Sequence, residues 1–155
     1  SVSYYYFVKM IKMPVYNDKT EPIYSIIIVN FITLGGCSLI SFFKLNDIIL
    51  SLLFLFQILA ANNNQGFLNR IYSYKWRVID CSNALLISLH GYINYKLIIP
   101  KIITYSFLPL LVLSCYAQSI SISKKDYIFL VNIWHLLVFN YINILSYFKE
   151  NPYKI

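Results

Sequence analysis

The sequence predicts an all-α integral membrane protein, a single helical bundle with about three to five membrane segments. Two observations favour this fold class. Hydrophobic residues make up 59% of the 155-residue chain and charged residues only 12%, against about 25% charged residues in ordinary soluble domains. Uncharged apolar runs recur along the chain, and several are long enough to cross a hydrocarbon layer.

The apolar runs divide the chain into segments. Five segments are expected, over about 22–43, 47–61, 80–100, 102–121 and 127–148. An aromatic and basic arm over 1–21 is expected at the membrane interface or on a partner, with a poorly ordered terminus as the alternative. A polar tail covers 149–155.

The run over 47–61 is short for a full crossing. Asn46 or Asp47 is expected to cap its start. The run crosses a thinned membrane, or crosses with Asn62 and Asn63 continuing the helix, or enters and leaves on one side. The polar stretch that follows is expected to be a loop with a short amphipathic helix near 67–78.

The net charge of +7 does not indicate nucleic-acid binding. Lys and Arg stand singly or in pairs at the ends of apolar runs, as interface anchors do. The cysteines Cys37, Cys81 and Cys115 form neither a CxxC pair nor a disulfide framework, and are expected to be buried thiols. No phosphate-binding, zinc-protease or serine-hydrolase motif is present. Acidic residues lie at segment ends, which disfavours an ion carrier or proton pump.

His90 is the main candidate for chemistry. It lies near the middle of an apolar stretch with no formal charge between Asp80 and Lys96, and an ionisable side chain at that depth is a functional-site hypothesis by default. On a helix, His90 shares one face with Asn83, Ile87, Asn94 and Ile98.

Two interpretations of His90 stay open. The ring is either hydrogen-bonded inside the bundle or bound to a haem iron, which needs one imidazole nitrogen while an acceptor holds the other N–H. The Asn94 side chain or a carbonyl one turn away is expected to be that acceptor. His135 is expected to serve packing or the interface.

The stretch from Asp80 to Trp134 resembles the small membrane-anchor subunit (the cytochrome b small subunit) of succinate dehydrogenase, respiratory complex II. The family pattern is roughly D-Y-S-x-A-x-x-L-T-L-H-G. The residues in register with it are Asp80, Ser82, Ala84, Ser88, Leu89, His90 and Gly91. Further on, Ile98 and Ile99 stand at a family valine pair, and Cys115–Tyr116 and Ile133–Trp134 echo two later helix ends.

The resemblance implies three core transmembrane helices, with the remaining one or two apolar segments as extensions that bind extra partners. It implies a multi-pass protein of the mitochondrial inner membrane. The implied partners are the large cytochrome b anchor, the iron–sulfur subunit and the flavoprotein subunit, in a complex that sits in the lipid bilayer and can join a larger respiratory supercomplex. The polypeptide would do no chemistry alone.

The implied cofactors are haem b and ubiquinone. His90 would be an axial haem ligand, and Asn94 stands at a family glycine beside the porphyrin. Lys96 and Lys101 would meet the haem propionates. The family's quinone-contacting Asp-Tyr pair falls on Lys101 and Ile102, so Tyr95 or Tyr105 is the candidate substitute. The alternative function is a cofactor-free structural subunit of another respiratory or ATP synthase complex. A small carrier or channel is disfavoured, because repeats and paired broken helices are absent.

Overall fold

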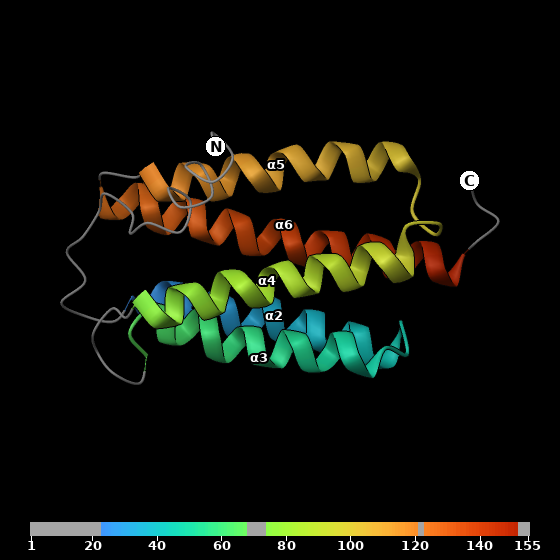
Figure 1. The fold of residues 1–155 in the computed structure, drawn as a ribbon, viewed down its shortest axis with the longest axis horizontal. Coiled ribbons are helices and arrows are strands. Elements are labelled where there is room, and N and C mark those ends of the chain that lie inside the picture. The colour runs from blue at the N-terminus through green and yellow to red at the C-terminus, as the bar shows by residue number, and fades with distance from the viewer. Residues whose placement is uncertain (1–22, 68–73, 121–122, 152–155) are drawn as a thin grey trace.

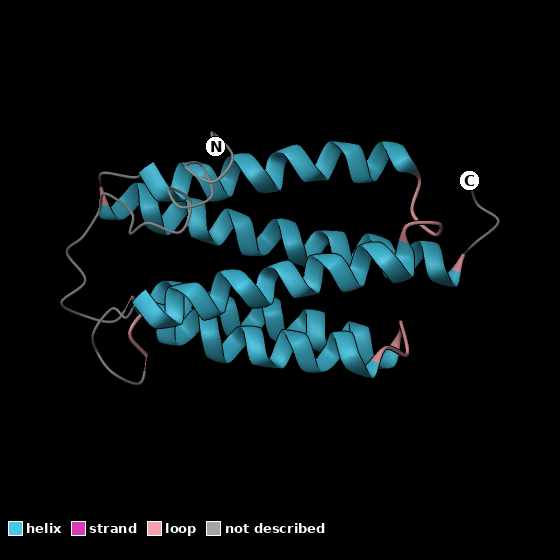
Figure 2. Ribbon diagram, viewed as in Figure 1, coloured by secondary structure: helices cyan, strands magenta, loops and turns pink. Residues whose placement is uncertain are grey.

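A computed structural model describes residues 23–67, 74–120 and 123–151 (Figure 1). Within these ranges the chain forms helices and no strand (Figure 2), which confirms the all-α prediction. The helices are α2 (Tyr24–Phe43), α3 (Ile48–Asn64), α4 (Tyr74–Tyr95), α5 (Lys101–Ile120) and α6 (Lys124–Glu150). The arm predicted over 1–21 lies outside the described residues, as does most of the predicted polar tail.

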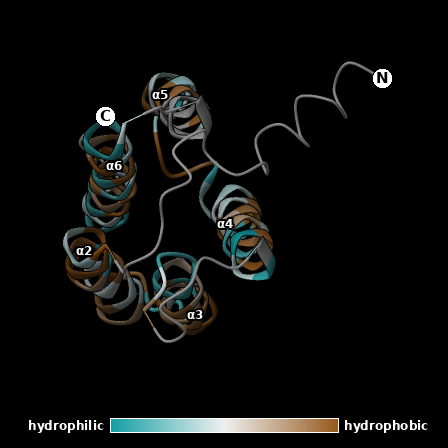
Figure 3. Ribbon diagram, turned by 90° about the vertical axis from the view of Figure 1, so that its left-hand side faces the viewer, coloured by the Kyte–Doolittle hydropathy of each residue, from teal (hydrophilic) through white to brown (hydrophobic). Residues whose placement is uncertain are grey.

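The helices lie side by side, and each packs mainly on its neighbours in an arc. α3 packs on α2 and α4, α2 also packs on α6, and α6 packs on α5. Figure 3, which looks along the bundle, shows the resulting order α4, α3, α2, α6, α5. α4 and α5 follow one another in the sequence but form the two ends of this arc.

The starts of α3 and α6 follow from side-chain capping. The Asp47 carboxylate accepts the backbone N–H of Leu50 at 2.9 Å, and the Ser123 hydroxyl accepts that of Asp126 at 3.1 Å. Each cap satisfies a backbone donor that the first helical turn leaves unpaired. α3 continues through Asn62 and Asn63, which agrees with the alternative in which these two residues extend the helix.

α4 differs from the predicted segment over 80–100. It begins at Tyr74, so the short separate helix expected near 67–78 was wrong where residues 74–78 are concerned. The helix also ends at Tyr95, and a turn over residues 96–98 separates it from Pro100. The other proline expected inside a segment, Pro109, lies within α5.

Two helices are long and apolar enough to cross a membrane by length and composition, namely α2 and α6. α3 is a shorter apolar helix. Among the described residues, the chain is thus helical and has two helices that could cross a membrane, which is part of the predicted fold class.

The bundle buries both apolar and polar side chains, and it leaves many large apolar side chains on its outside. On α3 the buried positions include Ser51, Gln57 and Asn62, and on α2 they include Asn30. The outward positions of α3 are large and apolar, and they are Ile48, Ile49, Leu52, Leu55, Phe56 and Leu59. The described part of the bundle therefore has an apolar core that also holds polar side chains, and its exterior is far more apolar than that of a usual soluble domain.

Candidate functional site

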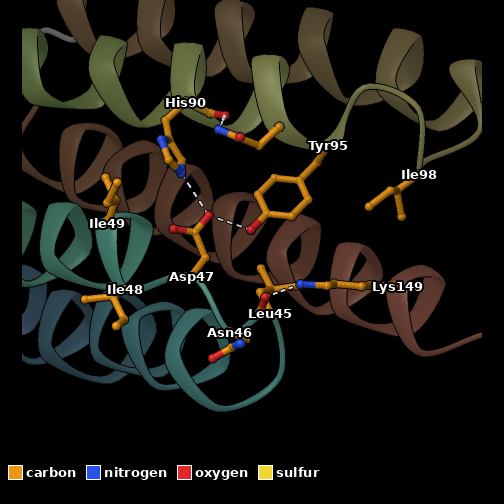
Figure 4. A pocket seen from close by; sticks show the side chains of 10 residues that line it. Leu45, Asn46, Asp47, Ile48, Ile49, His90, Tyr95, Ile98 and Lys149 are labelled. Carbon is orange, nitrogen blue, oxygen red and sulfur yellow. Dashed lines mark hydrogen bonds and ion pairs between the residues drawn. The ribbon is translucent and has the colours of Figure 1, made fainter.

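An open pocket of about 520 Å³ lies at the end of the bundle where the chain turns from α2 into α3 (Figure 4). Its apolar wall is formed by Leu45, Ile48, Ile49 and Ile98. Its polar wall is formed by Asn46, Asp47, His90, Asn94, Tyr95 and Lys149. The pocket thus draws residues from the α2–α3 turn, the end of α4 and the last turn of α6.

Asp47 is the centre of the polar wall. Its Oδ2 atom lies 2.8 Å from His90 Nε2 and accepts a hydrogen bond from the Tyr95 hydroxyl at 2.5 Å. The carboxylate also accepts the Leu50 N–H at the start of α3. His90 and Asp47 are mostly buried, with 19% and 12% of their side-chain surface exposed. One carboxylate therefore caps α3 and holds two side chains of α4.

The electrostatic effects on Asp47 oppose one another. Burial alone would raise its pKa, but hydrogen bonds from Tyr95, the Leu50 amide and His90 together lower the pKa below its ordinary value of 3.8. Asp47 is therefore ionised at neutral pH, and its charge is satisfied by donors from this chain.

Local backbone geometry directs the turn that carries Asp47. Asn46 has a φ of 51°, in the left-handed region that asparagine tolerates better than most residues. On the far side of the pocket, the Lys149 amine donates to the Leu45 carbonyl, and its Nζ lies 5.9 Å from the Tyr95 ring centroid. The turn is thus fastened to α6 as well as to α4.

The structure brings three of the six predicted site residues together. His90, Asn94 and Tyr95 line the pocket, whereas Lys96, Lys101 and Tyr105 are not among its lining residues. Lys96 lies over the Tyr92 ring, 5.6 Å from its centroid. Tyr105 is largely exposed on α5.

The expected acceptor for His90 was wrong. The Asn94 side chain donates to the His90 backbone carbonyl at 2.8 Å and does not contact the ring, whereas Asp47 does. Sequence reasoning treated Asp47 only as a cap. Antiparallel packing of segment 47–61 against segment 80–100, had it been assumed, would have placed Asp47 near His90.

A second polar cluster ties α3 to α4 further along the bundle. Gln57 donates to the Asp80 carboxylate at 2.5 Å, and Asn64 donates to it at 2.8 Å. Asn83 donates to the Gln57 side-chain oxygen at 2.6 Å. Asn83, which was predicted to share a helix face with His90, and Asp80, which matches the family pattern, therefore form contacts between helices.

Other buried polar side chains also have hydrogen-bond partners inside the bundle. Asn30 of α2 donates to Asn62 of α3 at 2.9 Å. His135 is buried, and its Nδ1 lies 2.8 Å from the Val131 carbonyl one turn earlier. The expected packing role of His135 agrees with this contact.

In the orientation seen here, the His90 ring is not placed to be an axial ligand of a haem iron. Ligation through Nε2 requires the hydrogen bond to Asp47 to break. Ligation through Nδ1 keeps that bond, but Nδ1 adjoins the ring carbon attached to Cβ and is the more hindered of the two ring nitrogens. The Tyr95 hydroxyl is likewise engaged by Asp47 and is not directed at a ligand.

Comparison of the chain with protein-family models, curated proteins and solved structures found no match. The fold and the site by themselves define a class, a helical bundle with polar side chains in its core, an apolar exterior and an amphipathic pocket at one end. A narrower assignment depends on the sequence resemblance carried by α4.

Proposed function

We propose that the chain is a multi-pass membrane-anchor subunit of succinate dehydrogenase, respiratory complex II, in the mitochondrial inner membrane. It would hold the flavoprotein and iron–sulfur subunits on the membrane beside the large cytochrome b anchor. The resemblance from Asp80 to Gly91 supports the family, and all of these residues lie on α4. The chain itself would carry no catalytic group.

The observation that carries the membrane part of this proposal is the apolar exterior of the bundle, together with the polar side chains that it buries. α4 buries Arg77 and Asn83 and exposes the apolar residues Leu85, Leu89 and Ile93. In water, such continuous apolar faces are unfavourable by about 25 cal/mol for each Å². In hydrocarbon the same faces are favoured, and polar side chains pair inside the bundle. We therefore place α3 and α4 in the bilayer together with α2 and α6.

Haem b shared with the large anchor remains a prediction of the resemblance. If His90 ligates the iron, it must leave Asp47. The test is the reduced-minus-oxidised spectrum of the purified complex. Ligation predicts loss of the b-type band in His90→Ala and its retention in Asp47→Ala. An unchanged band in both variants removes the metal role of His90 and leaves the anchor role standing.

Ubiquinone contact also remains a prediction. Tyr95 lines the pocket, but its hydroxyl donates to Asp47, whereas Tyr105 is exposed on α5. A ring bound at Tyr105 would need a second wall from the large anchor subunit. Replacing Tyr105 with phenylalanine in the intact complex tests this contact through the KM for a soluble quinone.

A second candidate is a cofactor-free structural subunit of another respiratory or ATP synthase complex. One observation favours it: Asp47, His90 and Tyr95 satisfy one another within the chain. Such a closed group stabilises helix packing without any ligand.

Affinity purification of the tagged chain from membranes in mild detergent separates the two candidates. The anchor proposal predicts co-purification of a flavoprotein and an iron–sulfur subunit in equal amounts. Recovery of proton-pump or ATPase subunits in their place would support the second candidate. A tagged, unrelated multi-pass protein of the same membrane is the matched control for non-specific association.

A further inference from the structure

The pocket at the α2–α3 turn lies where a membrane headgroup layer is expected. α2 and α6, the helices apolar enough to cross a membrane, both finish at this end of the bundle (Figure 1). The pocket-lining residues belong to the turn after α2 and to the last turn of α6. Its depth therefore corresponds to the boundary between hydrocarbon and water.

The described residues at this end carry an excess of positive charge. The bases are Lys44, Lys96, Lys101 and Lys149, and the acids are Asp47 and Glu150. Glu150 pairs with Lys44 at 3.1 Å, and Asp47 already accepts hydrogen bonds from Tyr95, His90 and the Leu50 amide.

The ammonium group in the pocket lining is that of Lys149. It contacts the Leu45 carbonyl and the Tyr95 ring. The ion pairs among the described residues involve other side chains. An ammonium group has three N–H donors. The Lys149 amine therefore keeps donors for an acceptor in the pocket, whose lining also includes Asn46 (Figure 4).

An apolar track leads away from the pocket. Ile48 and Ile49 form part of the pocket wall and continue onto the exposed α3 face at Leu52. Leu97, which is 91% exposed, and Ile93, which is also exposed, neighbour the lining residues Ile98 and Asn94 in the sequence. A ligand with an anionic head and a hydrocarbon tail matches this arrangement, because the tail can follow the apolar faces while the head meets the amine.

We propose that the pocket binds the phosphate headgroup of an anionic phospholipid, with Lys149 as the charged donor and the isoleucine wall as the start of the acyl-chain track. Asp47 does not repel the phosphate strongly, because donors from His90 and Tyr95 offset its charge. The proposal requires a membrane-embedded bundle but does not require complex II.

The test uses the full chain purified in a neutral detergent, with phosphatidylglycerol as the probe and phosphatidylcholine as the reference lipid. Native mass spectrometry measures how much of each lipid the protein retains. The wild type should retain phosphatidylglycerol preferentially, and Lys149→Ala should lower that preference about fivefold or more, since one lysine near an anionic headgroup contributes about that factor. Lys149→Arg should keep most of it.

Lys124→Ala is the matched control, because it removes the same charge from the opposite end of α6. It should change the preference by less than about twofold. Equal losses in Lys124→Ala and Lys149→Ala would show general surface attraction and overturn the site. Displacement of the lipid by decylubiquinone with no effect of Lys149→Ala would also overturn it, in favour of a quinone pocket.

A second variant keeps the test valid if Lys149→Ala does not fold. Ile98→Glu adds a carboxylate to the pocket wall without removing a hydrogen bond, and it should abolish the preference for phosphatidylglycerol. Size-exclusion chromatography and helical circular dichroism identify folded variants. A folded Ile98→Glu protein with an undiminished preference would contradict the proposal.

Discussion

The Nε2 atom of His90 lies 2.8 Å from Oδ2 of Asp47, and this contact joins the middle of the chain to a turn 43 residues earlier. Because α4 packs chiefly on α3, the hydrogen bonds of Asp47 fasten the end of α4 to the bundle. The same contact gives the pocket its polar wall and takes up the histidine nitrogen that a metal would need.

Replacing Asp47 with alanine should destabilise the bundle by about 2–4 kcal/mol. The change leaves two donors unpaired and removes the cap of α3. Unfolding by SDS titration in mixed micelles measures the loss, with Asp126→Ala at the exposed start of α6 as the control. A double-mutant cycle with His90→Ala should show coupling, and strictly additive effects would contradict the contact.

Stability should depend on pH through Asp47. Its folded-state pKa lies below the ordinary value of 3.8, so the folded state holds a proton less readily than the unfolded state does. The stabilisation is therefore present above pH 3.8 and is lost as pH falls through the folded pKa. The stability difference between wild type and Asp47→Asn should shrink between about pH 5 and about pH 3. Parallel curves for the two proteins would exclude this role.

Replacing Gln57 with leucine should destabilise the bundle by about 1–3 kcal/mol, because it removes hydrogen bonds to Asp80 and Asn83 in a buried setting. Leu55→Ala, on the outward face of the same helix, is the control and should have a smaller effect. The SDS titration used for Asp47 serves here as well. A larger loss from the Leu55 change would mean that the outer face packs against protein.

Arginine at position 55 should impair membrane insertion of α3. The Leu55 side chain is exposed on the apolar exterior, and a charge near the centre of a membrane helix is unfavourable by about 2.5–3.5 kcal/mol on insertion scales. A glycosylation-based insertion assay measures this, with Leu55→Ala as the conservative control. Unchanged insertion would place this face of α3 in water.

Sequence patterns predicted the helices better than their ends. Charge-free runs and the lysine or aspartate residues that flank them located all five segments. The start of α4 was missed because Lys75 and Arg77 interrupt the apolar pattern there. Arg77, which was expected in a loop, is buried against the bundle and has interactions there, so tertiary packing overrides the local signal.

Only part of the site was predicted, because its residues come from several segments. A polar stripe on one helix located His90 and Asn94 together, since their spacing is local, whereas Tyr95 was named only through the family resemblance. Asp47 and Lys149 come from other segments, and their approach depends on the packing order α4, α3, α2, α6, α5. No periodicity within a segment encodes that order.

The most direct test of the anchor role is to deplete the chain from its native cells and follow the succinate-oxidising flavoprotein. The account predicts that the flavoprotein moves from the membrane pellet to the soluble fraction, and that re-expression of the chain restores it to the membrane. A flavoprotein that stays fully membrane-bound after depletion, with succinate:quinone activity unchanged, would contradict the proposed function.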